Sequence, residues 1–183
     1  MYELALFAGG GGGLLASQWL KGWRTICYVE REPYAIEVLK ARIRDGLLDD
    51  APIWSDVRSF TKRNNQSRRF IRSLRAIRQD LVITGGFPCQ PFSSAGKQLG
   101  ADDPRNMWPD TVRVVAEIRP AAVYLENVST LLSGSHGYFG QILSDLADIG
   151  YDARWMVLSA ADVGAPHIRK RLWVVAHPAS RGA

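Results

Sequence analysis

Short runs rich in β-branched residues alternate with amphipathic stretches along this chain. This alternation predicts an α/β fold in which helices connect the strands of an open, mainly parallel sheet. The expected strands cover residues 4–7, 24–30, 52–57, 81–84, 121–125, 151–158 and 172–176. The expected helices cover residues 14–20, 33–44, 107–118 and 141–149, with a basic helix after a surface loop at 62–67. A Gly/Pro/Ser-rich loop at 85–104 follows the fourth strand, and loops of that length usually carry function.

The composition excludes several other classes of protein. A chain of 183 residues with 46% hydrophobic and 22% charged residues is typical of one globular domain, not of a disordered or fibrous protein. Its apolar runs are shorter than the roughly 20 residues that span a bilayer. Its first residues lack the basic region and apolar stretch of a secretory signal peptide. We therefore expect a cytoplasmic protein with no membrane partner. Two cysteines are too few for a disulfide framework, and no metal is expected.

The net charge of +5 is unevenly distributed. Residues 58–78 contain eight basic residues and no acidic one, which leaves −3 for the rest of the chain. One basic block on a mildly acidic body favours an anionic polymer such as DNA as partner. The alternative is a solvated helix face, because Phe70, Leu74 and Ile77 have the spacing of an ordinary helix that docks on a core.

A run of five glycines, Gly9 to Gly13, follows the first strand and precedes a helix. Glycine lets the backbone approach a ligand closely, and a helix N-terminus offers free N–H groups. Glu30 ends the next strand, where an acidic residue reaches ribose hydroxyls in nucleotide-binding folds, and Asp56 at the end of the third strand can reach an adenine. Together they predict an adenosine-type cofactor, although each acid alone could be a surface charge. The glycines leave a dinucleotide and S-adenosylmethionine both open.

The loop after the fourth strand holds a cysteine between two prolines, Pro88 and Pro91. Proline fixes its own φ and restricts the residue before it, which suits a thiol that must be held still. Because this loop follows the fourth strand, we expect Cys89 at the carboxyl end of that strand, where open α/β sheets bind ligands. Cys27, in the middle of the second strand, is interpreted as a small core residue.

These blocks resemble the motifs of DNA (cytosine-5) methyltransferases, in the same order, over about residues 2 to 177. The nucleophile motif is matched by Gly-Gly-Phe-Pro-Cys-Gln-Pro-Phe-Ser at residues 85–93. The Glu-Asn-Val motif is matched at residues 126–128, and the Gln-x-Arg-x-Arg motif at residues 167–171, with His167 in place of the glutamine. The resemblance implies a Rossmann-like S-adenosylmethionine-dependent methyltransferase fold with an antiparallel C-terminal strand.

The resemblance also implies a set of site residues. The cofactor-binding set would comprise Phe7, Gly9, Gly10, Gly11, Gly12, Glu30, Asp56, Val57 and Pro88. The catalytic set would comprise Cys89, Glu126, Arg169 and Arg171, with S-adenosylmethionine as cofactor, S-adenosylhomocysteine as product and no metal.

Each catalytic residue has an implied role. The Cys89 thiolate would add to C6 of cytosine, and Glu126 would supply a proton at N3. Arg169 would bridge the carboxylate and the O2 atom of the base, and Arg171 would fix the carboxylate or the cysteine loop. The target base would be flipped out of duplex DNA. Residues 93–104 would close over the DNA, anchored by the segment 105–108.

The chain departs from the family pattern at its C-terminus, where we expect neither a target-recognition domain nor the last two motifs. We expect one catalytic domain, residues 1–183, with a cofactor half at 1–84 and a catalytic half at 85–183. It could be a compact bacterial or phage methylase, one subunit of a split enzyme with a separate recognition subunit, or an inactive relic. A DNA- or cofactor-binding module and an RNA cytosine methylase also remain open.

Overall fold

The computed structural model describes residues 1–88, 106–133 and 137–180. Its strands are β1 (Tyr2–Leu6), β2 (Arg24–Val29), β3 (Ile53–Trp54), β4 (Leu81–Gly85), β5 (Ala122–Val128), β6 (Tyr151–Ser159) and β7 (Lys170–Pro178). Its helices are α1 (Gly12–Lys21), α2 (Pro33–Arg44), α3 (Asn65–Ala76), α4 (Trp108–Ile118) and α5 (Tyr138–Asp148). Short 3-10 helices are η1 (Arg78–Asp80), η3 (Ser129–Leu131) and η4 (Ala160–Val163).

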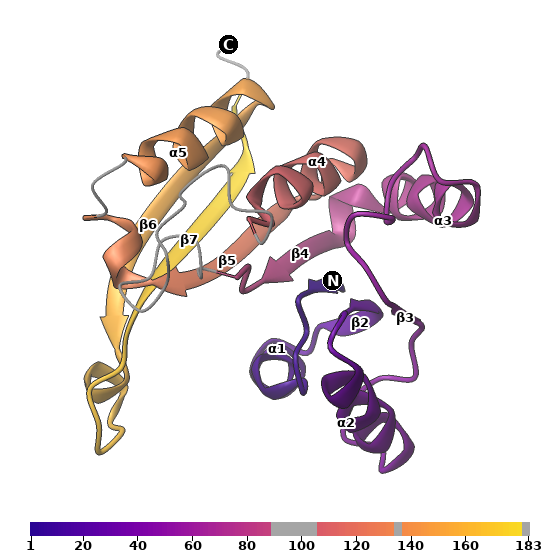
Figure 1. Ribbon diagram of the computed structural model, residues 1–183, viewed down its shortest axis with the longest axis horizontal. Coiled ribbons are helices and arrows are strands. Elements are labelled where there is room, and N and C mark those ends of the chain that lie inside the picture. Colours follow the sequence, from indigo (N-terminus) through magenta and orange to yellow (C-terminus); the bar gives the residue numbers. More distant parts are fainter. Residues whose placement is uncertain (89–105, 134–136, 181–183) are drawn as a thin grey trace.

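The strands form one seven-stranded sheet in the order β3-β2-β1-β4-β5-β7-β6. All neighbours from β3 to β5 are parallel, whereas β7 is antiparallel to both β5 and β6. Figure 1 shows α4 and α5 along strands β4 to β7, and α1 and α2 beside β1 and β2. The predicted α/β class, with its parallel sheet and antiparallel C-terminal strand, is confirmed.

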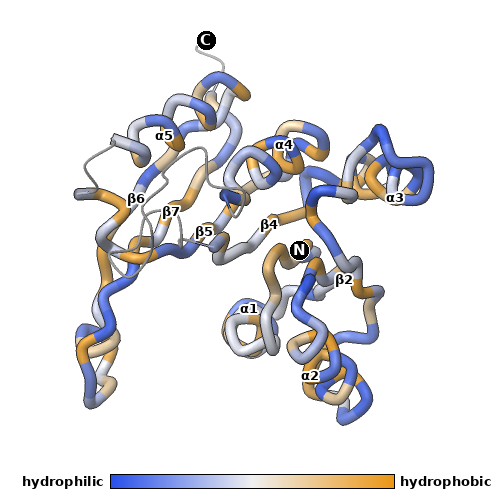
Figure 2. Tube along the Cα trace, in the orientation of Figure 1, coloured by the Kyte–Doolittle hydropathy of each residue, from blue (hydrophilic) through white to orange (hydrophobic). Residues whose placement is uncertain are grey.

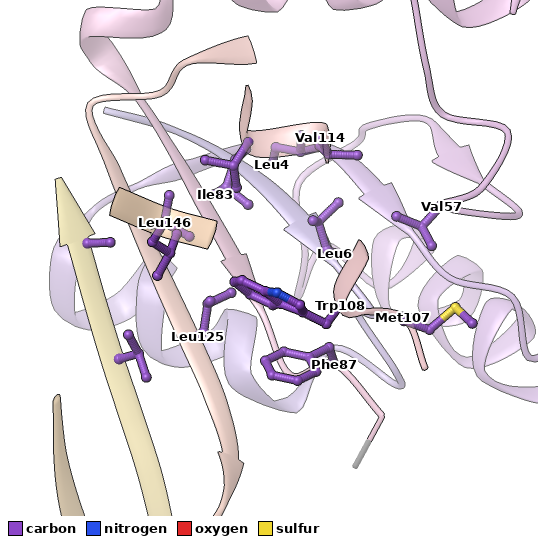
Figure 3. Close-up of a cluster of buried hydrophobic side chains, with 14 of the residues drawn as sticks. Leu4, Leu6, Val57, Ile83, Phe87, Met107, Trp108, Val114, Leu125 and Leu146 are labelled. Atoms are coloured by element: carbon purple, nitrogen blue, oxygen red, sulfur yellow. The ribbon is translucent and has the colours of Figure 1, made fainter. Parts of the chain in front are cut away.

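The larger hydrophobic core lies between the sheet and the helices α3, α4 and α5. Alternate residues of each strand point into it, such as Leu4 and Leu6 of β1 and Val123 and Leu125 of β5. Figure 3 shows part of this core, with Phe87 next to the Trp108 indole. A smaller cluster of buried residues joins α1 and α2 to the opposite face of β1 and β2.

A buried carboxylate connects the centre of the sheet to α1. Glu3 of β1 is 1% exposed, and its Oε2 accepts hydrogen bonds from the hydroxyls of Ser17 (2.6 Å) and Thr25 (3.0 Å). Its Oε1 accepts a hydrogen bond from the Thr84 hydroxyl at 2.7 Å. A charge without water needs such partners, so these hydroxyls from α1, β2 and β4 offset the cost of its burial.

Three predicted segments differ in the structure. The fifth strand, predicted at 121–125, extends to Val128 and so contains the Glu-Asn-Val motif that was expected just after it. The third strand spans two residues rather than 52–57, because the chain turns at Asp56, whose carboxylate accepts the N–H of Arg58 at 2.8 Å. The predicted surface loop at 62–67 ends sooner, since α3 begins at Asn65 with Asn64 as its N-cap. Ser67 is buried there, and its hydroxyl donates to the carbonyls of Ser59 and Thr61. The polar composition of residues 62–67 had suggested a surface loop there.

The burial of two leucines predicts how much each contributes to the free energy of unfolding. Leu146 of α5 is 0% exposed, whereas Leu20 of α1 is 80% exposed. Leu146→Ala should lower the free energy of unfolding by about 2–5 kcal/mol, because it removes buried methyl groups and leaves a cavity. Leu20→Ala should change it by less than about 0.5 kcal/mol. Urea unfolding followed by circular dichroism measures both, and equal losses would contradict this description of the core.

Candidate active site

The carboxyl ends of β1, β2, β4 and β5 meet at one edge of the sheet, where the glycine loop, Glu30 and the segment toward Cys89 follow β1, β2 and β4, and where Glu126 lies near the end of β5. β1 pairs with β4 so that Leu6 lies opposite Gly85, and β4 pairs with β5 so that Gly85 lies opposite Leu125. The glycine loop, the segment that leads to Cys89, and Glu126 therefore begin side by side. This edge is where open α/β sheets bind ligands.

The glycine loop is tied to the carboxylate at the end of β2. The N–H of Gly9 donates to Glu30 Oε2 at 2.7 Å, and Glu30 Oε1 accepts the N–H groups of Arg31 and Glu32 at 2.8 Å each. The sequence had placed Gly9 and Glu30 near each other through strand order alone. The structure brings them into direct contact.

Positive φ or a close neighbour explains three of the five glycines, since Gly9 has φ +55° and Gly10 and Gly11 are crowded. Gly11 has φ +81°, and a Cβ there would lie 2.7 Å from Leu48 Cδ1 and 3.2 Å from Leu39 Cδ2. A Cβ on Gly10 would lie 3.2 Å from Val38 Cγ1. The Gly10 carbonyl also accepts a hydrogen bond from the Arg42 guanidinium of α2, a contact with no signal in the sequence.

The loop leaves open space where a cofactor would fit. A Cβ added at Gly9, Gly12 or Gly13 would meet no other atom within 4 Å. Open backbone next to a carboxylate fits an adenosyl group, whose ribose hydroxyls are hydrogen-bond donors.

The remaining residues predicted to bind the cofactor differ in how far they are buried. Phe7 is half-buried, has φ +53° and packs against the larger core. Val57 is buried in that core, and its carbonyl accepts from Arg113 Nη2 at 2.8 Å, so its side chain is not free to touch a ligand. Asp56 and Pro88 are half-buried.

An ion pair fixes the acidic residue of the Glu-Asn-Val motif. Arg171 Nε of β7 lies 2.6 Å from Glu126 Oε1 of β5, and both side chains are partly exposed. Arg171 pairs across the strands with Val128, two residues after Glu126, so the two charged side chains share one face of the sheet.

Arg169 does not make the carboxylate contact predicted for it. It precedes the first residue of β7, beyond the point where β7 pairs with the end of β5, and its side chain is exposed. Its carbonyl accepts the N–H of Ala160 near the β6–β7 connection. The ion pair with Glu126 therefore comes from Arg171, because only Arg171 lies alongside β5.

The chain that leads into Cys89 packs against Glu126. A Cβ on Gly86 would lie 3.1 Å from Glu126 Oε2, so a glycine lets this segment approach the carboxylate closely. The Asn127 side-chain amide donates to the Phe87 carbonyl at 3.1 Å, and this bond is buried. Cys89 itself, like Ser93 and the rest of the loop to Arg105, lies outside the described residues.

Residues 106–108, which follow the cysteine loop in sequence, are held firmly in the core, and their expected role in anchoring that loop stays a prediction. Asn106, Met107 and Trp108 are buried, and Asn106 Nδ2 donates to the Tyr138 hydroxyl at 2.6 Å. Trp108 Nε1 donates to Asp145 Oδ2 at 2.7 Å, and its ring lies 5.5 Å from that of Phe87. Phe87, just before residues 89–105, and Trp108, just after them, therefore pack in the same core.

The second cysteine is unsuited to nucleophilic chemistry. Cys27 is 1% exposed, and burial raises the pKa of its thiol to about 12. The thiolate is the nucleophile, so a thiol that stays protonated near neutral pH is inert. In the described part of the chain no group of His, Cys, Asp and Glu residues could hold a metal ion. None of the helices there is long and apolar enough to cross a membrane.

The sequence of the chain also matches known protein families. The family model for C-5 cytosine-specific DNA methylases matches residues 1–182. The chain belongs to this family.

Individual relatives cover most of the chain. It is 36% identical over 175 residues to the Type II methyltransferase M.NgoMIV of Neisseria gonorrhoeae, covering 95% of this chain and 51% of the relative. It is 33% identical over 185 residues to M.AquIA of Picosynechococcus, covering 94% of this chain and 70% of the relative. The crystal structure of the S. pombe Dnmt2 methyltransferase has the same fold, with a TM-score of 0.70 at 20% identity over 100% of this chain and 52% of that one. The chain therefore spans about half the length of M.NgoMIV and 70% of that of M.AquIA.

The glycine loop yields a matched pair of variants. Gly11→Ala places a Cβ at positive φ and against Leu48, so it should lower the free energy of unfolding by about 1–2 kcal/mol or more. Gly13→Ala lies inside α1 with open space around it, and should raise stability by about 0.5–1 kcal/mol. Thermal unfolding measures both. If the two variants behaved alike, the conformation assigned to this loop would be wrong.

Proposed function

We propose that this chain transfers a methyl group from S-adenosylmethionine to C5 of cytosine in DNA. The observation that carries the proposal is the close approach of Gly86 to the Glu126 carboxylate, which is itself paired with Arg171. Gly86 begins the segment that leads to Cys89, so nucleophile and acid would reach the same base from neighbouring strand ends. The family description supports DNA as the substrate.

The cofactor would be held at the ends of β1 and β2. Glu30 would accept the ribose hydroxyls, and the open backbone at Gly9 and Gly12 would accommodate the amino acid portion. Asp56 would receive the adenine edge, and Val57 would contribute through its backbone. When bound, the sulfonium supplies an electrophilic methyl group.

The chemistry of the base requires a temporary loss of aromaticity. The Cys89 thiolate adds to C6, and a proton delivered to N3 through Glu126 takes up the electron pair displaced into the ring. Electron density at C5 then increases, and C5 takes the methyl group. Loss of the C5 proton to solvent water expels the Cys89 thiolate from C6, and return of the N3 proton to Glu126 restores the neutral aromatic ring.

Two arginines support this chemistry in different ways. Arg171 holds the Glu126 carboxylate in place through the ion pair across β5 and β7. Arg169, exposed at the start of β7, is free to reach the O2 atom of a base that enters from solvent. Asn127 fixes the start of the cysteine loop through the Phe87 carbonyl.

The chain spans about half the length of M.NgoMIV, so selection of the target sequence is a separate question. A recognition subunit in a second polypeptide remains a prediction, as do a bacterial or phage origin and a cytoplasmic location.

Covalent trapping tests the proposed nucleophile. Duplex DNA that contains 5-fluorocytosine cannot lose its C5 substituent as a proton, so the adduct should persist once the methyl group has been transferred. With S-adenosylmethionine present, the wild-type chain and Cys27→Ala should form a denaturant-resistant protein–DNA complex, and Cys89→Ala should form none. Denaturing gel electrophoresis measures this. A complex that survives in Cys89→Ala would contradict the assignment.

A further inference from the structure

The basic residues between positions 58 and 78 have no role in the site described above. All eight are exposed, at Arg58, Lys62, Arg63, Arg68, Arg69, Arg72, Arg75 and Arg78. Figure 2 shows α3 and the turn before it largely in blue, at the edge of the molecule.

Helix α3 separates an apolar face from a cationic one. Ser67, Ile71 and Leu74 are buried, and they follow the i, i+4, i+7 spacing of one helix face. Arg68, Arg72 and Arg75 follow the same spacing one position further along the chain and so form a second row, with Arg69 beside it. We call these four residues the arginine stripe. At 1.5 Å per residue, Arg68 and Arg75 lie about 10 Å apart along the helix axis.

The arginine stripe works against the stability of its own helix. Like charges three or four residues apart repel each other, as between Arg68 and Arg72 or between Arg72 and Arg75. Arg68 and Arg69 also lie near the helix N-terminus, where the helix dipole disfavours cations, and the first turn holds no acidic residue.

The described part of the chain offers the stripe no carboxylate partner. In residues 1–88, 106–133 and 137–180, none of the four guanidinium groups forms an ion pair with an acidic side chain; Arg75 instead donates to the backbone carbonyl of Glu117 at 3.3 Å. By contrast, the exposed face of α2 mixes both signs, with Lys40 and Glu37 2.7 Å apart. A helix face that is merely solvated would resemble α2.

The stripe is also rigidly attached to the cofactor side of the site. The Asn64 side chain, which caps α3, donates to the Ser59 carbonyl at 2.9 Å, and Ser59 follows Asp56 by three residues. Arg113 of α4 donates to the carbonyls of Val57 and Phe60 in the same loop. A ligand bound along α3 would therefore be held in a fixed position relative to the loop after β3.

We propose that the arginine stripe of α3 binds the phosphate backbone of the DNA substrate without reading its sequence. Guanidinium groups pair with phosphates in a fixed, bidentate geometry, and several of them in one row suit a polyanion better than a single small anion. The proposal rests on the proposed function for its choice of DNA, and it concerns binding rather than methyl transfer.

The test measures the salt dependence of binding to a 30-base-pair duplex that contains only A·T pairs. Such a duplex offers no cytosine to the site, so failure of the proposed methyl transfer would leave this measurement unaffected. The test variant is Arg68→Gln, Arg69→Gln and Arg72→Gln combined, since glutamine keeps helix propensity while removing the charge. Arg75 is kept because it contacts Glu117.

Two control variants accompany the test variant. Lys21→Gln, Lys40→Gln and Arg44→Gln combined removes the same charge from exposed positions on α1 and α2. Arg68→Lys, Arg69→Lys and Arg72→Lys combined keeps the charge of the stripe. Circular dichroism confirms that each variant is folded.

The expected result is a slope of log Kd against log salt concentration that decreases by about two to three in the test variant, because each phosphate contact contributes about 0.9. In the two control variants the slope should differ from that of the wild type by less than about 0.9, the contribution of one phosphate contact. An equal decrease in the α1/α2 control would assign binding to overall charge and overturn the proposal. A wild-type chain that does not bind this duplex, or an unchanged slope in the test variant, would overturn it as well.

Discussion

The parallel pairing of β1 with β4 at the centre of the sheet determines where the functional groups lie. With Leu6 opposite Gly85, the glycine loop and the segment leading to the cysteine leave the sheet at the same edge. A shift of one residue would reverse which side chains face the core, so the apolar residues of both strands fix this register.

Buried polar contacts then hold these elements together. Glu3 joins β1, β2, β4 and α1 through three hydroxyl groups, beneath the edge where the loops begin. Near the end of β5, the partly exposed Arg171 of β7 holds Glu126, and the buried Asn127 amide holds the Phe87 carbonyl. Rigid support of this kind is what a site needs if reacting atoms are to meet in a fixed geometry.

Much of this arrangement could be predicted from the sequence. Periodicity gave the strand and helix pattern, and the position of Glu30 and Glu126 at strand ends predicted which carboxylates lie near the glycine and cysteine loops. The contacts of Arg42 with Gly10 and of Glu3 with its hydroxyl partners could not be predicted, because they join residues with no shared local pattern. Arg171 contacts Glu126, one of the two roles expected for it, whereas the carboxylate contact expected of Arg169 is not formed, because only the pairing of β7 with β5 shows which arginine lies alongside Glu126.

The central claim is that one edge of this sheet brings a cofactor methyl group and a cytosine together. The most direct measurement uses S-adenosylmethionine with a deuterated methyl group and duplex DNA of mixed sequence, followed by mass spectrometry of the nucleosides. The account predicts that the label appears in 5-methyl-2′-deoxycytidine and in no other nucleoside, and that Glu126→Gln lowers its yield about 10²-fold or more. Label on an exocyclic nitrogen of cytosine or adenine, or label in no nucleoside, would contradict it.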